Sequence, residues 1–242
     1  MWLVVIGLAG SACRRERPPP PADPAPAPSS VAAPQAPSAS VLSHRASFEL
    51  AKVTLSIVDV KMTQSLDPLL RTPADEAVVN GEFFDKAQRP LGLAVSSGKT
   101  LSVLAPNLSG GVLWIKDGIG HLTASEEYRE AAVDFAIQCR PRLTVDSKNN
   151  IKTDDGKRAA RTALCLRNGG RSLEILLAGA RDGEIPPTLF ELGALLAAEG
   201  CEQALNLDGG PSTGGAFRSD GGVVAFRPRG PVRHAVVVHS QR

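Results

Sequence analysis

Residues 205–215 read LNLDGGPSTGG, and this stretch guides the interpretation of the whole chain. The preceding run over 204–207 is apolar except for one amide, which predicts a buried strand that ends directly at Asp208. Four of the seven residues after Asp208 are glycine. Because glycine loses more backbone entropy on folding than other residues, this composition is too costly for a simple hairpin connection. We therefore predict that the loop has a function.

The loop offers three kinds of polar group. Asp208 supplies a carboxylate and is the candidate catalytic residue. Gly209 and Gly210 allow the backbone to approach a ligand closely, so that their N–H groups become candidate donors. The hydroxyls of Ser212 and Thr213 follow within five residues of the carboxylate. We predict that these four residues bind the substrate on which Asp208 acts.

A second polar segment, NGEFFD at residues 80–85, follows a predicted buried strand over 77–80. It combines an amide, a glycine, two carboxylates and two aromatic rings, and such rings stack on sugar faces. Taken alone, the segment is more typical of a turn with a phenylalanine plug. Its candidate residues are Glu82 and Asp85 as further catalytic carboxylates, and Asn80, Gly81 and Phe84 as substrate-binding residues.

Arginines mark two further segments. Arg161 and Thr162 begin a predicted strand. An arginine there is usually solvated or paired, but its planar guanidinium also suits bidentate binding of phosphate. We predict Arg161 as a catalytic phosphate clamp and Thr162 as a substrate-binding residue. The stretch RPRLTVD at 140–146 places a proline between two arginines before a strand, and we interpret it as ordinary edge-strand chemistry.

Short β-like runs separated by turn signals predict an α+β fold with a strand-rich mixed sheet and two or three helices. Three hairpins are predicted, over 91–104, 112–122 and 161–178. A short helix is predicted over 125–134, with a serine as its cap. A longer helix follows, because Thr188 and Glu191 form a capping box and Gly200 ends the apolar periodicity.

The N-terminal residues differ in composition from the rest of the chain. Residues 1–12 are apolar or small and precede Cys13, which resembles the lipobox of a bacterial lipoprotein; an ordinary cleaved signal peptide is the alternative. Nine of the 19 prolines lie between Pro18 and Pro37, in a stretch without the apolar bulk for a core. We predict a signal peptide with Cys13 as the lipidated residue at 1–13, a disordered Pro/Ala-rich tether at 14–47 and a globular domain at 48–242. The protein would then be exported and anchored in the membrane, facing the periplasm or cell surface.

Cys139, Cys165 and Cys201 remain if Cys13 is lipidated, which allows one disulfide and one thiol without indicating the pair. The four histidines show no zinc-binding spacing. Oxygen atoms of the candidate loops suit calcium or magnesium, which the sequence neither requires nor excludes. With 27 basic and 25 acidic residues, the chain offers no basic surface for nucleic acid. No apolar run reaches the about 20 residues of a membrane-spanning helix, so a membrane is expected as a partner only through the N-terminal lipid.

Four segments resemble the phosphodiester glycosidase family in order and spacing. They are NGEFFDKAQRPLGLAVSSGK (80–99), QCRPRLTVDSK (138–148), RTALCLRNGG (161–170) and ALNLDGGPST (204–213), and they match the patterns NxGFF…P(L/V)GL…GK, QxGPxLVxDGK, RTAIGxxxDG and ALNLDGGxSS/T. The resemblance begins at about residue 48 and implies the fold of this family. The family includes the lysosomal uncovering enzyme, which acts on a sugar-1-phosphodiester, and exported bacterial proteins associated with exopolysaccharides.

The resemblance and the residue chemistry together predict hydrolysis of a glycosyl-phosphate bond in a cell-surface or exopolysaccharide glycan. Asp208 would activate water or attack the anomeric carbon, Arg161 would hold the phosphate, and Asn80 would hold a sugar hydroxyl or orient Asp208. The alternative is a non-catalytic, lipid-anchored protein that binds glycan or assists polysaccharide assembly. Two departures from the patterns favour this alternative: Glu82 replaces a small residue, and Cys139-Arg140 replaces Gly or Ser-Gly before Pro141.

Overall fold

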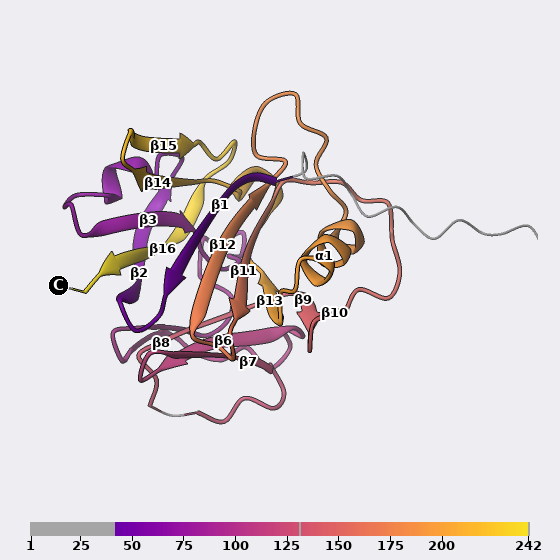
Figure 1. Cartoon of the computed structure of the whole chain (residues 1–242). Helices are drawn as coiled ribbons and strands as arrows, with labels where there is room; N and C mark the ends of the chain where they lie inside the picture. Colours follow the sequence, from indigo (N-terminus) through magenta and orange to yellow (C-terminus); the bar gives the residue numbers. More distant parts are fainter. Residues whose placement is uncertain (1–41, 131, 242) are drawn as a thin grey trace, which may run out of the picture. The chain divides into compact units, whose positions relative to one another are not determined.

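The computed structural model describes residues 42–130 and 132–241, which form three sheets and one α-helix (Figure 1). The predicted signal peptide, Cys13 and the tether up to residue 41 lie outside the described residues. The strand-rich α+β class is confirmed. Where one mixed sheet was expected, every strand pair in residues 42–130 and 132–241 runs antiparallel.

The first sheet has the strand order β1-β12-β11-β13-β9-β10. Its strands are β1 (Leu42–Glu49), β12 (Ser172–Ala178), β11 (Arg161–Arg167), β13 (Gln203–Asn206), β9 (Arg142–Val145) and β10 (Lys148–Asn149). Successive residues of β11 alternate between the central core and a second cluster beneath the helix α1 (Leu189–Ala198). Both faces of β11 are therefore buried, which explains its nearly continuous apolar sequence. The helix links β12 to β13 across β11, so β12 and β13 are not neighbours and no parallel pair forms.

The second and third sheets each have five strands. The second has the order β15-β14-β3-β16-β2, with β15 (Gly222–Phe226), β14 (Gly215–Ser219), β3 (Asp75–Asn80), β16 (Val232–Ser240) and β2 (Val53–Thr63). The third has the order β5-β4-β8-β6-β7, with β5 (Lys99–Ser102), β4 (Ala94–Ser96), β8 (Phe135–Cys139), β6 (Gly111–Lys116) and β7 (Ile119–Ala124). Two short 3₁₀ turns, η2 (Asp67–Leu69) and η3 (Gly210–Ser212), complete the fold. Apolar residues of all three sheets form one central core.

Several local predictions are confirmed. The hairpin β6–β7 turns at Asp117-Gly118, and the hairpin β11–β12 pairs Arg167 with Ser172. The capping box is present in both directions: Glu191 donates its backbone N–H to Thr188 Oγ1 at 3.1 Å, and Thr188 donates to Glu191 Oε2 at 3.1 Å. These features depend on neighbouring residues only, which explains why the sequence indicates them.

One boundary and one helix were predicted wrongly. Residues 42–47 were assigned to the tether but form most of β1, which pairs with β12. The helix expected over 125–134 is absent from its described residues, so that α1 is the single α-helix in the described part of the chain. There the backbone N–H groups of Glu127 and Tyr128 donate to the carbonyl of Ala124, and the Ser125 hydroxyl caps nothing. Burial of Tyr128 against the third sheet replaces the helical continuation.

A disulfide joins Cys165 on β11 to Cys201 just after α1, with an S–S distance of 2.05 Å, and Cys139 is a buried free thiol. This disulfide answers which two cysteines pair, a question that the sequence left open.

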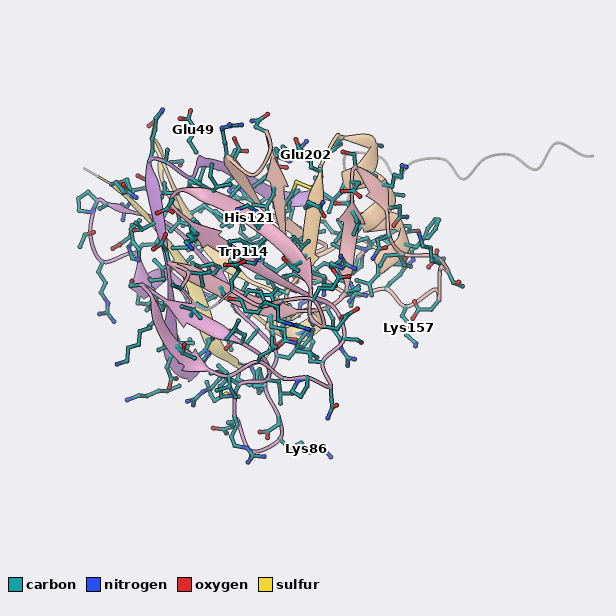
Figure 2. All side chains as sticks on the ribbon, turned by 90° about the horizontal axis from the view of Figure 1, so that it is seen from below. Glu49, Lys86, Trp114, His121, Lys157 and Glu202 are labelled. Carbon is teal, nitrogen blue, oxygen red and sulfur yellow. A yellow bond between two sulfur atoms is a disulfide. The ribbon has the colours of Figure 1, made fainter. Side chains whose placement is uncertain are left out.

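On the outer side of the third sheet, Trp114 and His121 stack across β6 and β7 with ring centroids 4.0 Å apart (Figure 2). Within residues 42–130 and 132–241, no helix has both the length and the apolarity to cross a membrane.

Candidate active site

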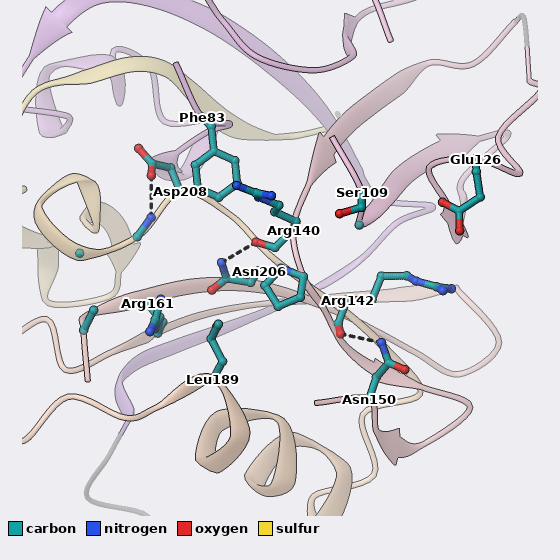
Figure 3. Close-up of a pocket in the computed structure, with 15 residues that line it drawn as sticks. Phe83, Ser109, Glu126, Arg140, Arg142, Asn150, Arg161, Leu189, Asn206 and Asp208 are labelled. Carbon is teal, nitrogen blue, oxygen red and sulfur yellow. Dashed lines mark hydrogen bonds between the residues drawn. The ribbon is translucent and has the colours of Figure 1, made fainter. Parts of the chain in front are cut away.

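A pocket of about 740 Å³ lies where the ends of several strands meet (Figure 3). Because β13 lies between β11 and β9 in the first sheet, Arg161 at the start of β11 and Arg142 at the start of β9 flank Asn206. Asp208 follows the end of β13, and Arg140 precedes β9. The pocket thus gathers a carboxylate, an amide and three guanidinium groups. Its wall also includes Phe83, Ser109, Glu126, Asn150 and Leu189.

Asn80 holds the loop that carries Asp208. Its side-chain amide donates to the Asp208 carbonyl at 2.7 Å, and Asp208 N–H donates to the Gly81 carbonyl at 3.2 Å. The Oδ1 atom of Asn80 accepts from the Thr162 hydroxyl at 2.6 Å and from the Gly214 N–H at 3.2 Å. With Asn80 fully buried, every polar atom of its side chain is used inside the protein. Of the two roles predicted for Asn80, the structure supports the orientation of Asp208.

The electrostatic setting of Asp208 favours a protonatable carboxylate. Burial raises the pKa of Asp208, and the nearby Glu82 carboxylate raises it further. The Ser212 hydroxyl and the Gly209 N–H, which donates to Asp208 Oδ1 at 2.9 Å, act in the opposite direction because they stabilise the charged form. A carboxylate with a raised pKa accepts a proton at neutral pH more readily than an ordinary aspartate.

The three arginines of the pocket are not neutralised by ion pairs. Within the described residues, Arg140, Arg142 and Arg161 have no carboxylate partner within 4.0 Å. Arg161 donates from Nη2 to the Lys157 carbonyl at 3.2 Å, while its buried Nε has no acceptor there. Burial lowers the pKa of Arg161, with Asp155 acting against this shift, yet a guanidinium stays charged at neutral pH. The pocket therefore presents positive charge with donors left for an anion.

The backbone donors predicted in the glycine loop are already used. Gly209 N–H donates to the Asp208 carboxylate, and Gly210 N–H donates to the Ala160 carbonyl at 2.7 Å. Both N–H groups are thus bound inside the protein, while both residues line the pocket. Gly210 has φ of +59°, and a Cβ there would meet nothing within 4 Å. Its glycine serves the left-handed turn that places Asp208.

The two hydroxyls after the glycines lie behind the pocket. Ser212 and Thr213 are buried, and neither lines it. The Ser212 hydroxyl donates to the Pro231 carbonyl at 3.4 Å and also stabilises the charged form of Asp208. Thr213 Oγ1 is buried without a partner among the described residues. Direct contact of these hydroxyls with substrate, as predicted, does not fit this placement.

The two carboxylates predicted as catalytic partners are also outside the pocket. Glu82 is buried and contacts Nδ1 of His234 on β16. Asp85 lies in an exposed turn, where it accepts from the Arg89 N–H at 2.9 Å and pairs with the Arg89 guanidinium at 2.7 Å. These contacts with Arg89 lower the pKa of Asp85. Neither side chain is placed to react with a ligand beside Asp208.

Three predicted binding residues have structural roles. Thr162 is buried, and its hydroxyl is committed to Asn80. A Cβ on Gly81 would lie 2.9 Å from the His234 carbonyl, so glycine is needed for close packing. Phe84 forms a bridge with Pro90, whereas the neighbouring Phe83 lines the pocket.

Sequence reasoning missed Arg140 and Arg142, which it interpreted as edge-strand chemistry. Both line the pocket, Arg140 just before β9 and Arg142 at its start (Figure 3). The signal was the presence of two arginines in a segment that matches the family pattern. Asn206 was part of the quoted stretch but not a candidate. Its amide donates to the Arg140 carbonyl at 3.0 Å and to the Leu207 carbonyl at 2.7 Å, which joins β13 to the arginine segment.

A metal is not indicated by clustering of ligands: no group of three His, Cys, Asp or Glu side chains within residues 42–130 and 132–241 is arranged to hold one. The carboxylates near the site are instead separated, with Asp208 in the pocket and Glu82 paired to His234.

A family model described as phosphodiester glycosidase matches residues 74–239, which include the pocket residues on β9, β11 and β13. The chain belongs to the phosphodiester glycosidase family. Comparison with curated proteins finds no match. The family membership confirms the resemblance of the four sequence segments.

Two solved structures show the same fold. The catalytic domain of zebrafish N-acetylglucosamine-1-phosphodiester alpha-N-acetylglucosaminidase, auto-inhibited by its pro-peptide, is 17% identical with a TM-score of 0.62, over 80% of this chain and 74% of that one. A hypothetical protein from Synechocystis is 15% identical with a TM-score of 0.63, over 81% of this chain. The chain spans 59% of the length of the Synechocystis protein. At these identities the phosphodiester glycosidase fold is shared.

Proposed function

We propose that the protein is a hydrolase that cleaves the bond between the anomeric carbon of a sugar and a phosphodiester. The observation that carries this proposal is the Asp208 carboxylate in one pocket with three arginines that have no ion-pair partner among the described residues. Membership of the phosphodiester glycosidase family supports the reaction class. We propose the substrate only as a class, the diesters of a hexose-1-phosphate.

The reaction needs one base and one anion site. Asp208 takes a proton from water while the water oxygen bonds to the anomeric carbon. The bond from that carbon to the phosphate oxygen breaks, and its electron pair leaves with the phosphate. The products are a free sugar and a phosphate monoester of the alcohol, and the proton on Asp208 passes to solvent. Arg161 and Arg140 hold the negative charge on the phosphate as the bond breaks.

A strong general acid is not needed for this leaving group, since a phosphate oxygen is a weak base. This fits the position of Glu82 behind the pocket and of Asp85 in a surface turn. Glu126 is exposed, and Arg140 lies between Glu126 and Asp208 in Figure 3. Asp208 is thus the one reacting carboxylate of the proposed step.

Groups beside the arginines suit a sugar (Figure 3). Phe83 offers a ring face, and carbohydrate C–H groups pack on such faces. Asn150 and Ser109 add amide and hydroxyl groups that bind sugar hydroxyls. None of these contacts needs a metal ion. Calcium or magnesium, bound by oxygen atoms of the loop, is compatible with the proposal but not required by it.

We further propose that the protein is exported and anchored by lipid on Cys13, with the Pro/Ala-rich segment as a tether, and that its substrate is a cell-surface or exopolysaccharide glycan. The Cys165–Cys201 disulfide supports export, because disulfides persist in oxidising compartments. Incorporation of a palmitate analogue in a bacterial host tests the anchor. Incorporation into the wild-type chain that is lost in Cys13→Ala supports it, and incorporation that persists in Cys13→Ala contradicts it.

The activity is tested with the full chain and a panel of hexose-1-phosphate diesters, with free reducing sugar as the readout. We expect release by the wild type and by Asp85→Asn, which removes a carboxylate outside the pocket. Asp208→Asn should lower the rate by about 10²-fold or more, as expected for loss of a general base. If no diester is cleaved but a glycosyl phosphate binds in a manner that needs Arg161, the non-catalytic glycan-binding alternative is correct. The departures from the family patterns at Glu82 and at Cys139-Arg140 favour this alternative.

A further inference from the structure

The end of β3 is tied to two elements at once. Gly81 N–H donates to the His234 carbonyl at 2.7 Å, and the Gly81 carbonyl accepts from Asp208 N–H at 3.2 Å. Gly81, the residue directly after β3, therefore connects β16 on one side with the Asp208 loop on the other. Any shift of β16 relative to β3 moves the backbone that carries the carboxylate.

Glu82 follows Gly81, and its side chain does not line the pocket. Its side chain has no exposed surface, and that of His234 is 5% exposed. Glu82 Oε1 contacts His234 Nδ1, while the buried Oε2 has no partner among the described residues. A buried carboxylate is costly unless it is paired, and the contact with His234 supplies that partner.

Asp208 is the charged group on which Glu82 acts. The charge of Glu82 adds to burial in raising the pKa of Asp208. Cys139 lies against both carboxylates and stays a neutral thiol, because burial raises its pKa well above the ordinary value. The Ser212 hydroxyl and the Gly209 N–H favour the charged form of Asp208. Glu82 therefore acts against these two hydrogen bonds.

We propose that Glu82 and His234 form a positioning pair that holds Asp208 in place, and that Glu82 does not react with substrate. This rests on the proposed function of Asp208 as the base. The pair would keep the Asp208 carboxylate able to accept a proton. His234 fixes the direction of Glu82, and the Gly81 backbone transmits the position of β16 to the Asp208 loop.

The proposal is tested by a ¹³C NMR titration of the Asp208 carboxyl carbon in the full chain. Asp208→Asn assigns the resonance by its disappearance. In Glu82→Gln, which keeps the shape of the side chain, we expect the titration midpoint of Asp208 to fall by about half a unit or more. The pH at which kcat/KM falls in acid should decrease by a similar amount. Asp85→Asn removes the same charge from the surface turn and should leave the midpoint in place.

An unchanged Asp208 midpoint in folded Glu82→Gln would overturn the proposal. So would a loss of turnover as deep as that of Asp208→Asn without a change in the midpoint, since Glu82 would then react directly. His234 provides a second route if Glu82→Gln does not fold. His234→Asn retains a donor near the position of Nδ1 and should keep most of kcat, whereas His234→Phe should lose about tenfold. Equal kcat values in these two variants would contradict the role of the contact.

The titration needs no substrate, so its result is independent of the proposed hydrolysis. A lowered midpoint in a protein that cleaves no diester would leave the coupling of Glu82 to Asp208 intact and reject the enzyme. Turnover with an unchanged midpoint would reject the pair and leave the enzyme.

Discussion

The side-chain amide of Asn80 donates to the backbone carbonyl of Asp208 at 2.7 Å, across a separation of 128 residues in sequence. The contact joins the last residue of β3 to the loop after β13, which belong to different sheets. The same amide oxygen accepts from Thr162 on β11. One buried residue thus holds together the three segments from which the pocket is built.

Asn80→Ala should reduce both stability and activity. It leaves the Thr162 hydroxyl and the Gly214 N–H without their acceptor, and each buried unpaired group costs about 1–3 kcal/mol. We expect a lower free energy of unfolding in urea and a fall in kcat larger than any change in KM. Thr162→Val is the matched control, because it removes one bond to Asn80 and leaves the amide contact with Asp208. A kcat in Thr162→Val as low as in Asn80→Ala would contradict this explanation.

Arg161→Ala should weaken transition-state binding more than it weakens the fold. Loss of a donor to developing negative charge typically lowers kcat by about 10²-fold or more. Arg161→Lys keeps the charge without the planar fork and should recover part of the loss. Arg158→Ala is the control, since Arg158 pairs with Glu191 at the start of α1 and does not line the pocket. The account fails here if Arg158→Ala and Arg161→Ala lose equal activity.

Stability in acid should depend on Asp75. This carboxylate accepts from His239 Nδ1 at 2.7 Å and from Thr72 N–H at 2.6 Å, while His239 Nε2 lies 2.7 Å from the Ser56 hydroxyl. Burial raises the pKa of Asp75, but the hydrogen bonds from Thr72 and His239 outweigh it, so that the net shift is downward.

A depressed pKa contributes stability above the unfolded-state value, and this contribution disappears as the pH falls through the folded-state value. Asp75→Asn should therefore lower Tm at neutral pH, and the difference from wild type should shrink below pH of about 4. Thermal unfolding followed by circular dichroism over this range measures it. A Tm difference that stays constant into acid would show that charge is not the cause.

The Cys165–Cys201 disulfide should support the fold without tuning the chemistry. It closes a segment with a sequence separation of 36 residues, and such a cross-link contributes about 2–4 kcal/mol. The double variant Cys165→Ala/Cys201→Ala should lower the free energy of unfolding by this order. The pH profile of kcat/KM should be unchanged, because the bond lies on the α1 side of the first sheet. A moved profile would mean that the α1 face and the pocket are coupled.

Local signals in the sequence predicted local structure well. The capping box at Thr188 and the Asp117-Gly118 hairpin depend on residues a few positions apart, and both are present. Asp208 was predicted to be the catalytic residue because the glycine-rich loop beside it costs more backbone entropy than a simple hairpin connection requires. The predicted helix over 125–134 failed because packing of Tyr128 on the third sheet outweighs a weak helical pattern.

Roles within the site could not be predicted, because they depend on contacts between distant segments. Glu82 meets His234 at a separation of 152 residues, so nothing near Glu82 in the sequence shows that it is turned away from the ligand. The Gly210 N–H is taken by Ala160, a partner fixed only by the pairing of β11 with β13. Arg140 and Arg142 line the pocket because β9 pairs with β13, the strand that carries Asn206, and the sequence does not show this pairing.

The central claim is that water attacks the anomeric carbon and that the phosphate leaves with the bridging oxygen. Hydrolysis of a hexose-1-phosphate diester in H₂¹⁸O by the full chain tests it most directly, with both products analysed by mass spectrometry after a single turnover. The account predicts ¹⁸O in the free sugar and none in the phosphate monoester. Appearance of ¹⁸O in the phosphate would show attack at phosphorus, and it would contradict the roles given to Asp208 and Arg161.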